Sequence, residues 1–463
     1  MNNITKALAC AAMVGMATFA TAIPVVSNVT MTQCNASRLV TITYRLTEDA
    51  VVTLDVLTNA TPNAATGWAS IGGEAVCNAE GAVWRKVTSA DADGSGNYTI
   101  TWHPDLSWTD DFGKGFKIAD GCAKVVVTAY ALDNTPDYMV VDISAGAQQN
   151  TQRYYPSVDF LPGSVPGQTG AITNNTAYRN SLLVMRKIMA KDVVWVMGSV
   201  NEYDRTAAED THQVSLTNNY YIGVFEVTQT QWSQIFSGSR KNPQYFGVSG
   251  AMRPVERVSY NEIRCAAEGS SVASGGQWPS IPYEGSFLRR LRDRTGVDFD
   301  LPSEAEWEFA ARAGHGDRQW GNGAYMTTNN TSDPSLKPIA RFKGNEGGTS
   351  SDSNTPPEDG GTAICGSYQP NDWGLYDMHG NVMEICLDWY EASIGDNNGR
   401  VNIDVSSPLN ALSGNPGGNR VRRGGCYSHA ASSCRAATRG SNIAPNSTNL
   451  ATGFRLACRA GLK

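Results

Sequence analysis

Residues 419–459, NRVRRGGCYSHAASSCRAATRGSNIAPNSTNLATGFRLACR, are the stretch around which the chain is organised. The stretch opens with three arginines and a Gly-Gly pair, and it closes with a strand-like run, GFRLAC, at 453–458. The residues between these ends are almost all small and polar. Ordered ends around a middle that is poor in apolar residues predict a surface held in place rather than a core. We therefore expect the functional face of the protein here.

Length and charge limit the fold and exclude one class of partner. The chain has 463 residues, too many for one compact core, so at least two domains are expected. Hydrophobic residues make up 41% of the sequence, which is ample for globular folding. The formal net charge of −7 argues against a nucleic-acid partner, because such proteins present a basic face to the phosphates.

The N-terminus predicts export. Residues 1–22 have one lysine, a short apolar run and a terminal Ala-Thr-Ala, which is the pattern of a cleavable signal peptide. The apolar run is too short to span a membrane and no second one follows, so no integral membrane segment is expected. We predict a periplasmic, cell-surface or secreted protein.

Strand patterns dominate the first part of the mature chain. Runs such as VTITYRL (40–46) and YTITW (98–102) alternate apolar and polar residues, and turn-forming clusters separate them. Residues 23–150 are therefore predicted to form an antiparallel β-sandwich. Residues 151–181 are rich in Gln, Asn, Pro and Gly and are predicted to be a linker, and a second domain is expected at 182–463.

The second domain carries three helix-start signals of one kind. The segments TQTQ (228–231), SYNE (259–262) and SEAE (303–306) are capping boxes, in which the first and fourth residues satisfy each other's backbone amides. The helices are expected to be short, because long Gly-, Asn- and Ser-rich segments separate them. This pattern predicts an α+β, loop-rich domain.

Five motifs in this domain carry a family resemblance. In chain order they are YIGVFEVTQTQW (221–232), PVERVSYN (254–261), LPSEAEWEFAAR (301–312), WGLYDMHGNVME (373–384), and RGG (423–425) with GFR (453–455). From 182 to the C-terminus the chain resembles the formylglycine-generating enzyme (sulfatase-modifying factor) family. The resemblance implies a variant of the C-type-lectin-like fold, and it does not extend to residues 23–180.

The same resemblance bears on catalysis. Oxidases of this family convert a sulfatase cysteine to formylglycine with copper and oxygen, and they use two cysteines five positions apart after the Gly-Gly turn. Here His429 occupies the first of these positions and Cys434 the second, while Cys426 lies outside both. Because one copper thiolate is missing, the catalytic pair is incomplete and copper is not expected.

The resemblance also implies a calcium site and disulfides. The family's calcium ligands correspond to Asp377, Gly380, Val382 and Glu384, whose side-chain and backbone oxygens suit this hard cation. The alternative is a metal-free turn held by hydrogen bonds of the two carboxylates. In an exported chain, the resemblance implies the pair Cys265–Cys458. The pair Cys386–Cys434 is also predicted, which leaves Cys365 and Cys426 to each other.

The preferred hypothesis is a ligand-binding surface protein whose partner is a protein, peptide or glycan. The predicted binding surface is Tyr427, Ser428, His429, Ser432, Thr438, Ser441, Asn446 and Asn449. Many residues of 428–451 are types reached from an Asn codon by changing adenines, as in relatives of this family that retroelements diversify. The alternative is that small polar residues are common on exposed loops. The competing functions are a formylglycine-generating or related metal-dependent oxidase, and a structural envelope component.

Overall fold

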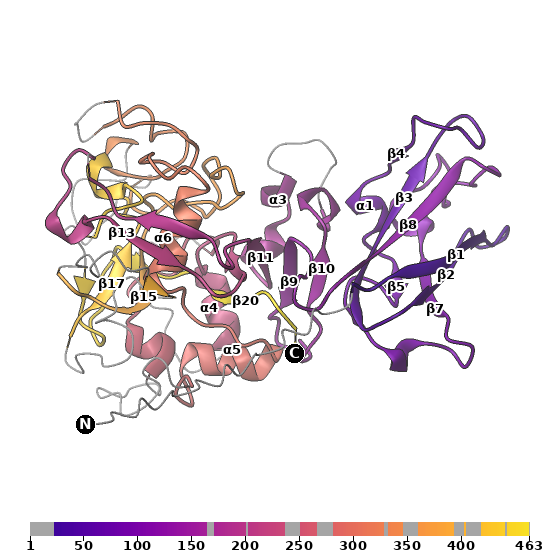
Figure 1. The fold of residues 1–463 in the computed structure, drawn as a ribbon, viewed down its shortest axis with the longest axis horizontal. Coiled ribbons are helices and arrows are strands. Elements are labelled where there is room, and N and C mark those ends of the chain that lie inside the picture. The colour runs from indigo at the N-terminus through magenta and orange to yellow at the C-terminus, as the bar shows by residue number, and fades with distance from the viewer. Residues whose placement is uncertain are drawn as a thin grey trace, which may run out of the picture.

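The structure is a computed structural model, and it shows two β-rich lobes joined by a central sheet (Figure 1). The predicted signal peptide lies outside the residues that it describes. Among the described residues, no helix is both long and apolar enough to cross a membrane. The described residues are 23–163, 171–200, 202–236, 251–265, 281–327, 332–345, 360–392, 402–403, 418–439 and 442–462.

The N-terminal lobe is built from two sheets, and every strand pairing within them is antiparallel. The inward-facing residues Val40, Ile42 and Tyr44 alternate with exposed or half-buried ones, and a single apolar cluster joins both sheets. The predicted antiparallel β-sandwich is confirmed for this region. One sheet has the order β1 (Val26–Gln33), β2 (Val40–Leu46), β7 (Tyr98–Trp102) and β5 (Glu80–Gly81); the other contains β4 (Ala69–Ser70), β3 (Ala50–Thr58), β6 (Lys86–Val87) and β8 (Ala123–Tyr130).

The predicted boundary at residue 150 is wrong. Strand β9 (Tyr138–Asp142) pairs with β11 (Leu182–Ile188), and β10 (Arg153–Tyr155) adds to its other edge. Both therefore belong to the central five-stranded sheet, in the order β10-β9-β11-β14-β20, with β14 at Tyr220–Gly223 and β20 at Ala457–Arg459. The apolar pattern of β9 would fit the N-terminal sandwich or the central sheet equally well, and only the strand pairing shows which sheet it joins. The predicted linker 151–181 accordingly contains β10, α3 (Ala171–Asn174) and a 3₁₀ turn, Thr176–Arg179.

The second lobe adds two small sheets and three principal helices. One sheet has the order β12 (Val194–Met197), β13 (His212–Ser215), β16 (Asn402–Ile403). The other has the order β18 (Asn442–Ile443), β17 (Arg420–Arg423), β15 (Met383–Trp389), β19 (Thr452–Gly453). The helices are α4 (Gln229–Ile235), α5 (Phe287–Thr295) and α6 (Glu304–Arg312); two single-turn helices, α1 (Gly73–Val76) and α2 (Pro104–Ser107), lie in the N-terminal lobe.

All three predicted capping boxes form. Thr228 caps α4 and Ser303 caps α6, each with the reciprocal side-chain bond from the residue three positions on. Ser259 and Glu262 exchange the same two bonds, at 2.8 and 3.2 Å, at the start of a short π-helical turn, Asn261–Cys265. Local sequence therefore determines where these helices begin.

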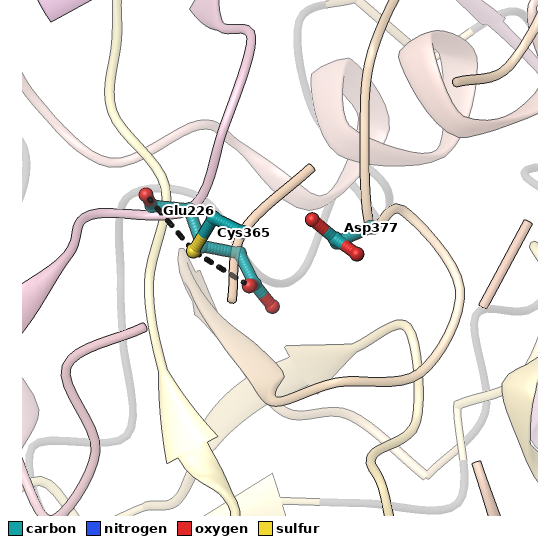
Figure 2. Close-up of side chains that lie close together, drawn as sticks. All are labelled: Glu226, Cys365 and Asp377. Carbon is teal, nitrogen blue, oxygen red and sulfur yellow. Dashed lines mark hydrogen bonds between the residues drawn. The ribbon is translucent and has the colours of Figure 1, made fainter. Parts of the chain in front are cut away.

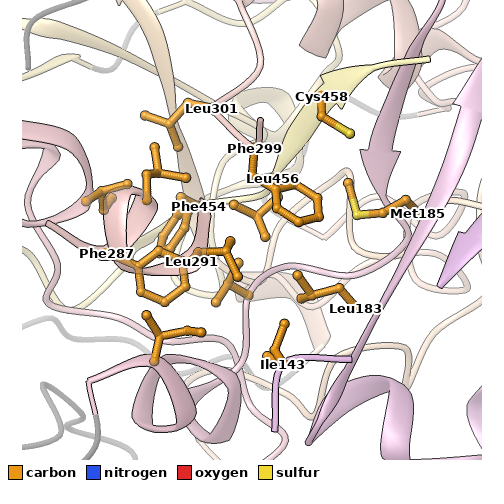
Figure 3. Close-up of a cluster of buried hydrophobic side chains, with 14 of the residues drawn as sticks. Ile143, Leu183, Met185, Phe287, Leu291, Phe299, Leu301, Phe454, Leu456 and Cys458 are labelled. Atoms are coloured by element: carbon orange, nitrogen blue, oxygen red, sulfur yellow. The ribbon is translucent and has the colours of Figure 1, made fainter. Parts of the chain in front are cut away.

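The main core of the second lobe combines aliphatic and aromatic side chains from distant parts of the chain (Figure 3). The Trp232 ring of α4 stacks on Phe287 of α5 with centroids 4.8 Å apart, and Phe454 meets Phe287 edge-on at 5.3 Å. The Gly-Phe-Arg motif near the C-terminus therefore anchors that end of the chain in the core. The α+β, loop-rich prediction is confirmed.

Candidate functional site

The two ends of segment 419–459 lie on either side of one strand. Within their sheet, β15 is central, with β17 antiparallel on one side and β19 parallel on the other. Glu384 of β15 is in register with Arg423 on one side and with Gly453 on the other. The two ends of segment 419–459, which were predicted to hold it in place, therefore belong to one sheet.

Buried arginines fix the segment between these strands. Arg439 donates to both oxygens of Glu304 on α6, at 2.6 and 3.0 Å, and Arg423 pairs with Glu308 one turn further along that helix. Arg435 pairs with Glu209 at 2.7 Å and with Glu202 at 2.6 Å. These ion pairs hold the backbone in one conformation, since an unpaired charge in such surroundings costs several kcal/mol.

The middle of the segment is not the surface that the sequence predicts. Of the predicted binding residues, Tyr427 and Ser432 are buried, Ser428, His429 and Thr438 are half-buried, and Ser441 lies outside the described residues. Asn446 and Asn449 are exposed, in the run 446–449 that is exposed throughout. Small residues serve close packing here: a Cβ on Gly425, whose φ is +71°, would lie 2.7 Å from the Cys434 sulfur.

The residues at the family's two cysteine positions are held inside this packed turn. The Cys434 thiol is fully buried beside the Cys426 backbone, and burial raises its pKa. His429 is half-buried, donates its backbone N–H to the Cys426 carbonyl at 3.0 Å, and has its ring pKa lowered by burial. Burial also raises the pKa of Cys426, whose sulfur lies 3.4 Å from the Ser428 hydroxyl. Both thiols are therefore protonated and poorly nucleophilic at neutral pH.

His379, which was not among the predicted site residues, holds this turn through hydrogen bonds of both ring nitrogens. Burial lowers its pKa to about 4, so the ring is neutral. Nδ1 donates to the Cys434 carbonyl at 2.8 Å, and Nε2 accepts from the Gly321 amide at 3.0 Å. The histidine of the WGLYDMHGNVME motif therefore positions the loop and is not a metal ligand.

The thiols of Cys365, Cys386, Cys426 and Cys434 are free in the structure, so the pairs Cys386–Cys434 and Cys365–Cys426 are not formed there. Cys386 lies in the cluster around Trp307, whereas Cys434 packs against Trp320. The Cys365 sulfur contacts Glu226 and not Cys426. Cys265 and Cys458 do share the main core cluster. The pair Cys265–Cys458 stays a prediction.

A buried acidic cluster lies next to the turn that enters β15. Glu226 follows β14, Cys365 comes from the loop at 360–382, and Asp377 precedes β15; ligand atoms of the three lie within 4.8 Å of one another (Figure 2). The Glu226 carboxylate accepts from Asn381 Nδ2 at 2.6 Å and from the Val382 amide at 3.2 Å. Sequence reasoning found Asp377 but missed Glu226 and Cys365, which are more than 130 residues apart.

Negative charge is crowded in this cluster. Burial, together with the neighbouring Asp377 and Glu384 charges, raises the pKa of Glu226 well above its usual range. Burial raises the pKa of Asp377 to about 6, although the Gly366 amide and Arg455 oppose the shift. The site therefore favours either a bound proton or a bound cation.

The predicted calcium ligands fit this arrangement only in part. Asp377 Oδ1 is buried without a hydrogen-bond partner among the described residues, as expected for a cation ligand. Glu384, however, is engaged by Arg455, whose Nη2 lies 2.7 Å from Oε1, and by the Trp307 indole N–H at 2.7 Å. Because a guanidinium already balances Glu384, the unbalanced carboxylates are Glu226 and Asp377.

Residues 181–460 match the family model described as a sulfatase-modifying factor enzyme 1-like domain, and this span is more than half of the chain. The chain belongs to this family. The N-terminal β-sandwich lies outside the matched residues. The family assignment explains why the five motifs occur in order, and it leaves the chemistry of this member to its own residues.

Several named proteins are similar to this chain over parts of their length. The formylglycine-generating enzyme of Thermomonospora curvata is 34% identical over 165 residues, covering 34% of this chain and 48% of that protein. The mouse formylglycine-generating enzyme is 26% identical, covering 57% and 72%. The chaperone protein LppX of Paenibacillus barcinonensis is 29% identical, covering 44% and 73%. Among solved structures, Treponema denticola variable protein 1 is 27% identical with a TM-score of 0.42, covering 60% and 95%.

Proposed function

We propose that this protein is an exported binding protein, whose sulfatase-modifying-factor-like domain presents segment 444–450 to a protein, peptide or glycan. The observation that carries the proposal is the contrast within the C-terminal stretch. Residues 446–449, Asn-Ser-Thr-Asn, are exposed, whereas both flanking strands belong to one sheet and the arginines around them are buried in ion pairs. A rigid frame with short polar side chains binds with little loss of conformational entropy.

The test is binding of the labelled full chain to glycan and peptide arrays. Ser447→Lys and Thr448→Lys add long charged side chains at exposed positions, and each should abolish the strongest signals. The matched control is Ser95→Lys, at an exposed turn of the N-terminal lobe. Ser95→Lys should bind as the wild type does; if the two loop variants also bind as the wild type does, the recognition surface lies elsewhere and the proposal fails. N-terminal sequencing of the mature protein tests the predicted export, with Ile23 as the expected first residue.

The alternative function is a formylglycine-generating oxidase, favoured by the 34% identity to the Thermomonospora curvata enzyme of that name. The buried, protonated state of Cys434 and the histidine at position 429 weigh against it. Oxygen consumption by the copper-loaded protein with a Cys-x-Pro-x-Arg peptide decides between the two. We expect no turnover; turnover that Cys434→Ser abolishes would establish the oxidase instead.

A further inference from the structure

Three side chains from three separate segments converge in the acidic cluster. Glu226 and Cys365 are fully buried and Asp377 is 2% exposed. The Cys365 sulfur lies 3.5 Å from Glu226 Oε2, and the Asp377 carboxyl faces both of them (Figure 2). This cluster is the one group of three or more His, Cys, Asp or Glu side chains with metal-ligand spacing in the described part of the chain.

The Asp377 side chain is held so that one oxygen is free for a ligand. Oδ2 accepts from the Gly366 amide at 2.7 Å, and Oδ1 is buried with no partner in the described structure. Asp377 itself has a left-handed backbone with φ of 57°, an uncommon conformation that fixes where its carboxyl projects. A buried carboxylate oxygen that is fixed and unsatisfied indicates a missing positive partner.

The charges around the cluster call for a divalent cation. Three carboxylates, those of Glu226, Asp377 and Glu384, share the guanidinium of Arg455, which is bonded to Glu384. Arg179, the next nearest arginine, donates to the backbone carbonyl of Cys365 at 3.0 Å. Two carboxylates thus lack a paired charge, and a single divalent ion would balance both.

We infer that Glu226, Asp377 and Cys365 bind a borderline divalent metal of the zinc class, with sulfur as one ligand. Calcium takes six to eight oxygen ligands and has no preference for sulfur. Zinc binds cysteine sulfur and carboxylate oxygen together, and three protein ligands with an open fourth position are common in its sites. On binding, the Cys365 S–H bond is replaced by a sulfur–metal bond, and the proton is released to solvent.

The metal would join three segments that support the binding face. Glu226 leads into α4, Cys365 belongs to the loop whose amide binds Asp377, and Asp377 begins the turn that enters β15. Because β15 lies between the two strands that frame segment 419–459, occupancy would stiffen that frame. The inference concerns this cluster alone, and it does not depend on what segment 444–450 binds.

The test uses cobalt as a spectroscopic substitute for zinc. The full-length chain is freed of metal with a chelator and titrated with Co²⁺. We expect a thiolate-to-cobalt charge-transfer band in the near ultraviolet, which zinc abolishes and an equal concentration of calcium does not. Failure of the band to appear, or its loss on adding calcium, would overturn the inference.

Matched variants identify which cysteine gives rise to the charge-transfer band. Cys365→Ser should remove it and weaken zinc binding by about tenfold or more. Cys386→Ser, at another fully buried cysteine outside the cluster, should leave it intact. If Cys365→Ser does not fold, Asp377→Asn serves, because asparagine also tolerates the left-handed backbone; it should weaken cobalt binding by a similar factor. A band that persists at the same affinity in Cys365→Ser would show that other thiols hold the metal, and in Asp377→Asn it would show that Asp377 is not a ligand; either result would overturn the inference.

Discussion

Replacing Asp377 by asparagine should stabilise the metal-free protein at neutral pH. Burial raises the pKa of this carboxyl to about 6 from an ordinary value of 3.8. At about 1.4 kcal/mol per pKa unit, the shift corresponds to about 3 kcal/mol of unfolding free energy lost on ionisation. Asparagine keeps the shape, retains an acceptor for the Gly366 amide and tolerates a φ of 57°. The substitution therefore removes little except the charge.

The sign of the pH dependence follows from the direction of the shift. Folded Asp377 binds its proton more tightly than the unfolded chain does. Its stabilising contribution is complete below about pH 4 and is lost as the pH rises through about 6. In chelator, the wild type should therefore lose stability relative to Asp377→Asn between these pH values, and the difference should level off near about 3 kcal/mol above pH 7.

Scanning calorimetry in chelator across this pH range measures the difference. The matched control is Glu384→Gln, which removes a carboxylate of the same cluster but leaves Arg455 buried without its partner. That variant should lose about 3–5 kcal/mol. The reasoning is refuted if Asp377→Asn is less stable than the wild type in chelator at pH 8, or if the difference between them does not change with pH. At a zinc concentration that only partly saturates the wild type, the wild type should gain more stability than Asp377→Asn.

Two further substitutions test how the binding segment is held. Arg439→Leu leaves Glu304 buried without its bidentate partner and should cost about 3–5 kcal/mol by chemical denaturation, whereas Arg289→Leu, in an exposed pair, should cost less than about 1 kcal/mol. Equal losses would contradict a framework role for the buried pair. Gly425→Ala must adopt a φ of +71° and crowd the Cys434 sulfur, so a loss of about 1–3 kcal/mol in unfolding free energy is expected. Gly94→Ala, with open space around it, is its control, and similar melting temperatures for the two variants would show that the turn adapts.

Local signals predicted the local structure of this protein. Each of the three capping boxes forms, because the bonds in a capping box join residues only three positions apart. The alternation of VTITYRL likewise predicted the buried face of β2. The domain boundary was wrong because alternation shows that a strand has an inner face, but not which sheet that strand joins. Strand β9 pairs with β11, about 40 residues later, and no local pattern encodes that choice.

The candidate site residues show the same contrast between what local sequence reveals and what depends on long-range contacts. The motif around Asp377 was visible in sequence, yet its neighbours Glu226 and Cys365 lie in segments with no metal-ligand spacing to it. The signal that could have found Glu226 was its position in YIGVFEVTQTQW, where a carboxylate interrupts an apolar run that must be buried. Composition alone misled at Ser432 and Tyr427, which looked exposed and are buried. Small polar residues are equally suited to a loop surface and to a tight turn.

The sequence by itself determined the family, the α+β class, the helix starts and the two strands that frame segment 419–459. Only the tertiary structure decided which part of that segment is exposed, that Cys386 and Cys434 lie in different clusters, and that Glu226 meets Cys365 and Asp377. The physical reason is the range of the interactions. Caps and strand alternation act over a few residues, whereas burial and charge balance depend on segments that the fold brings together from more than a hundred residues apart.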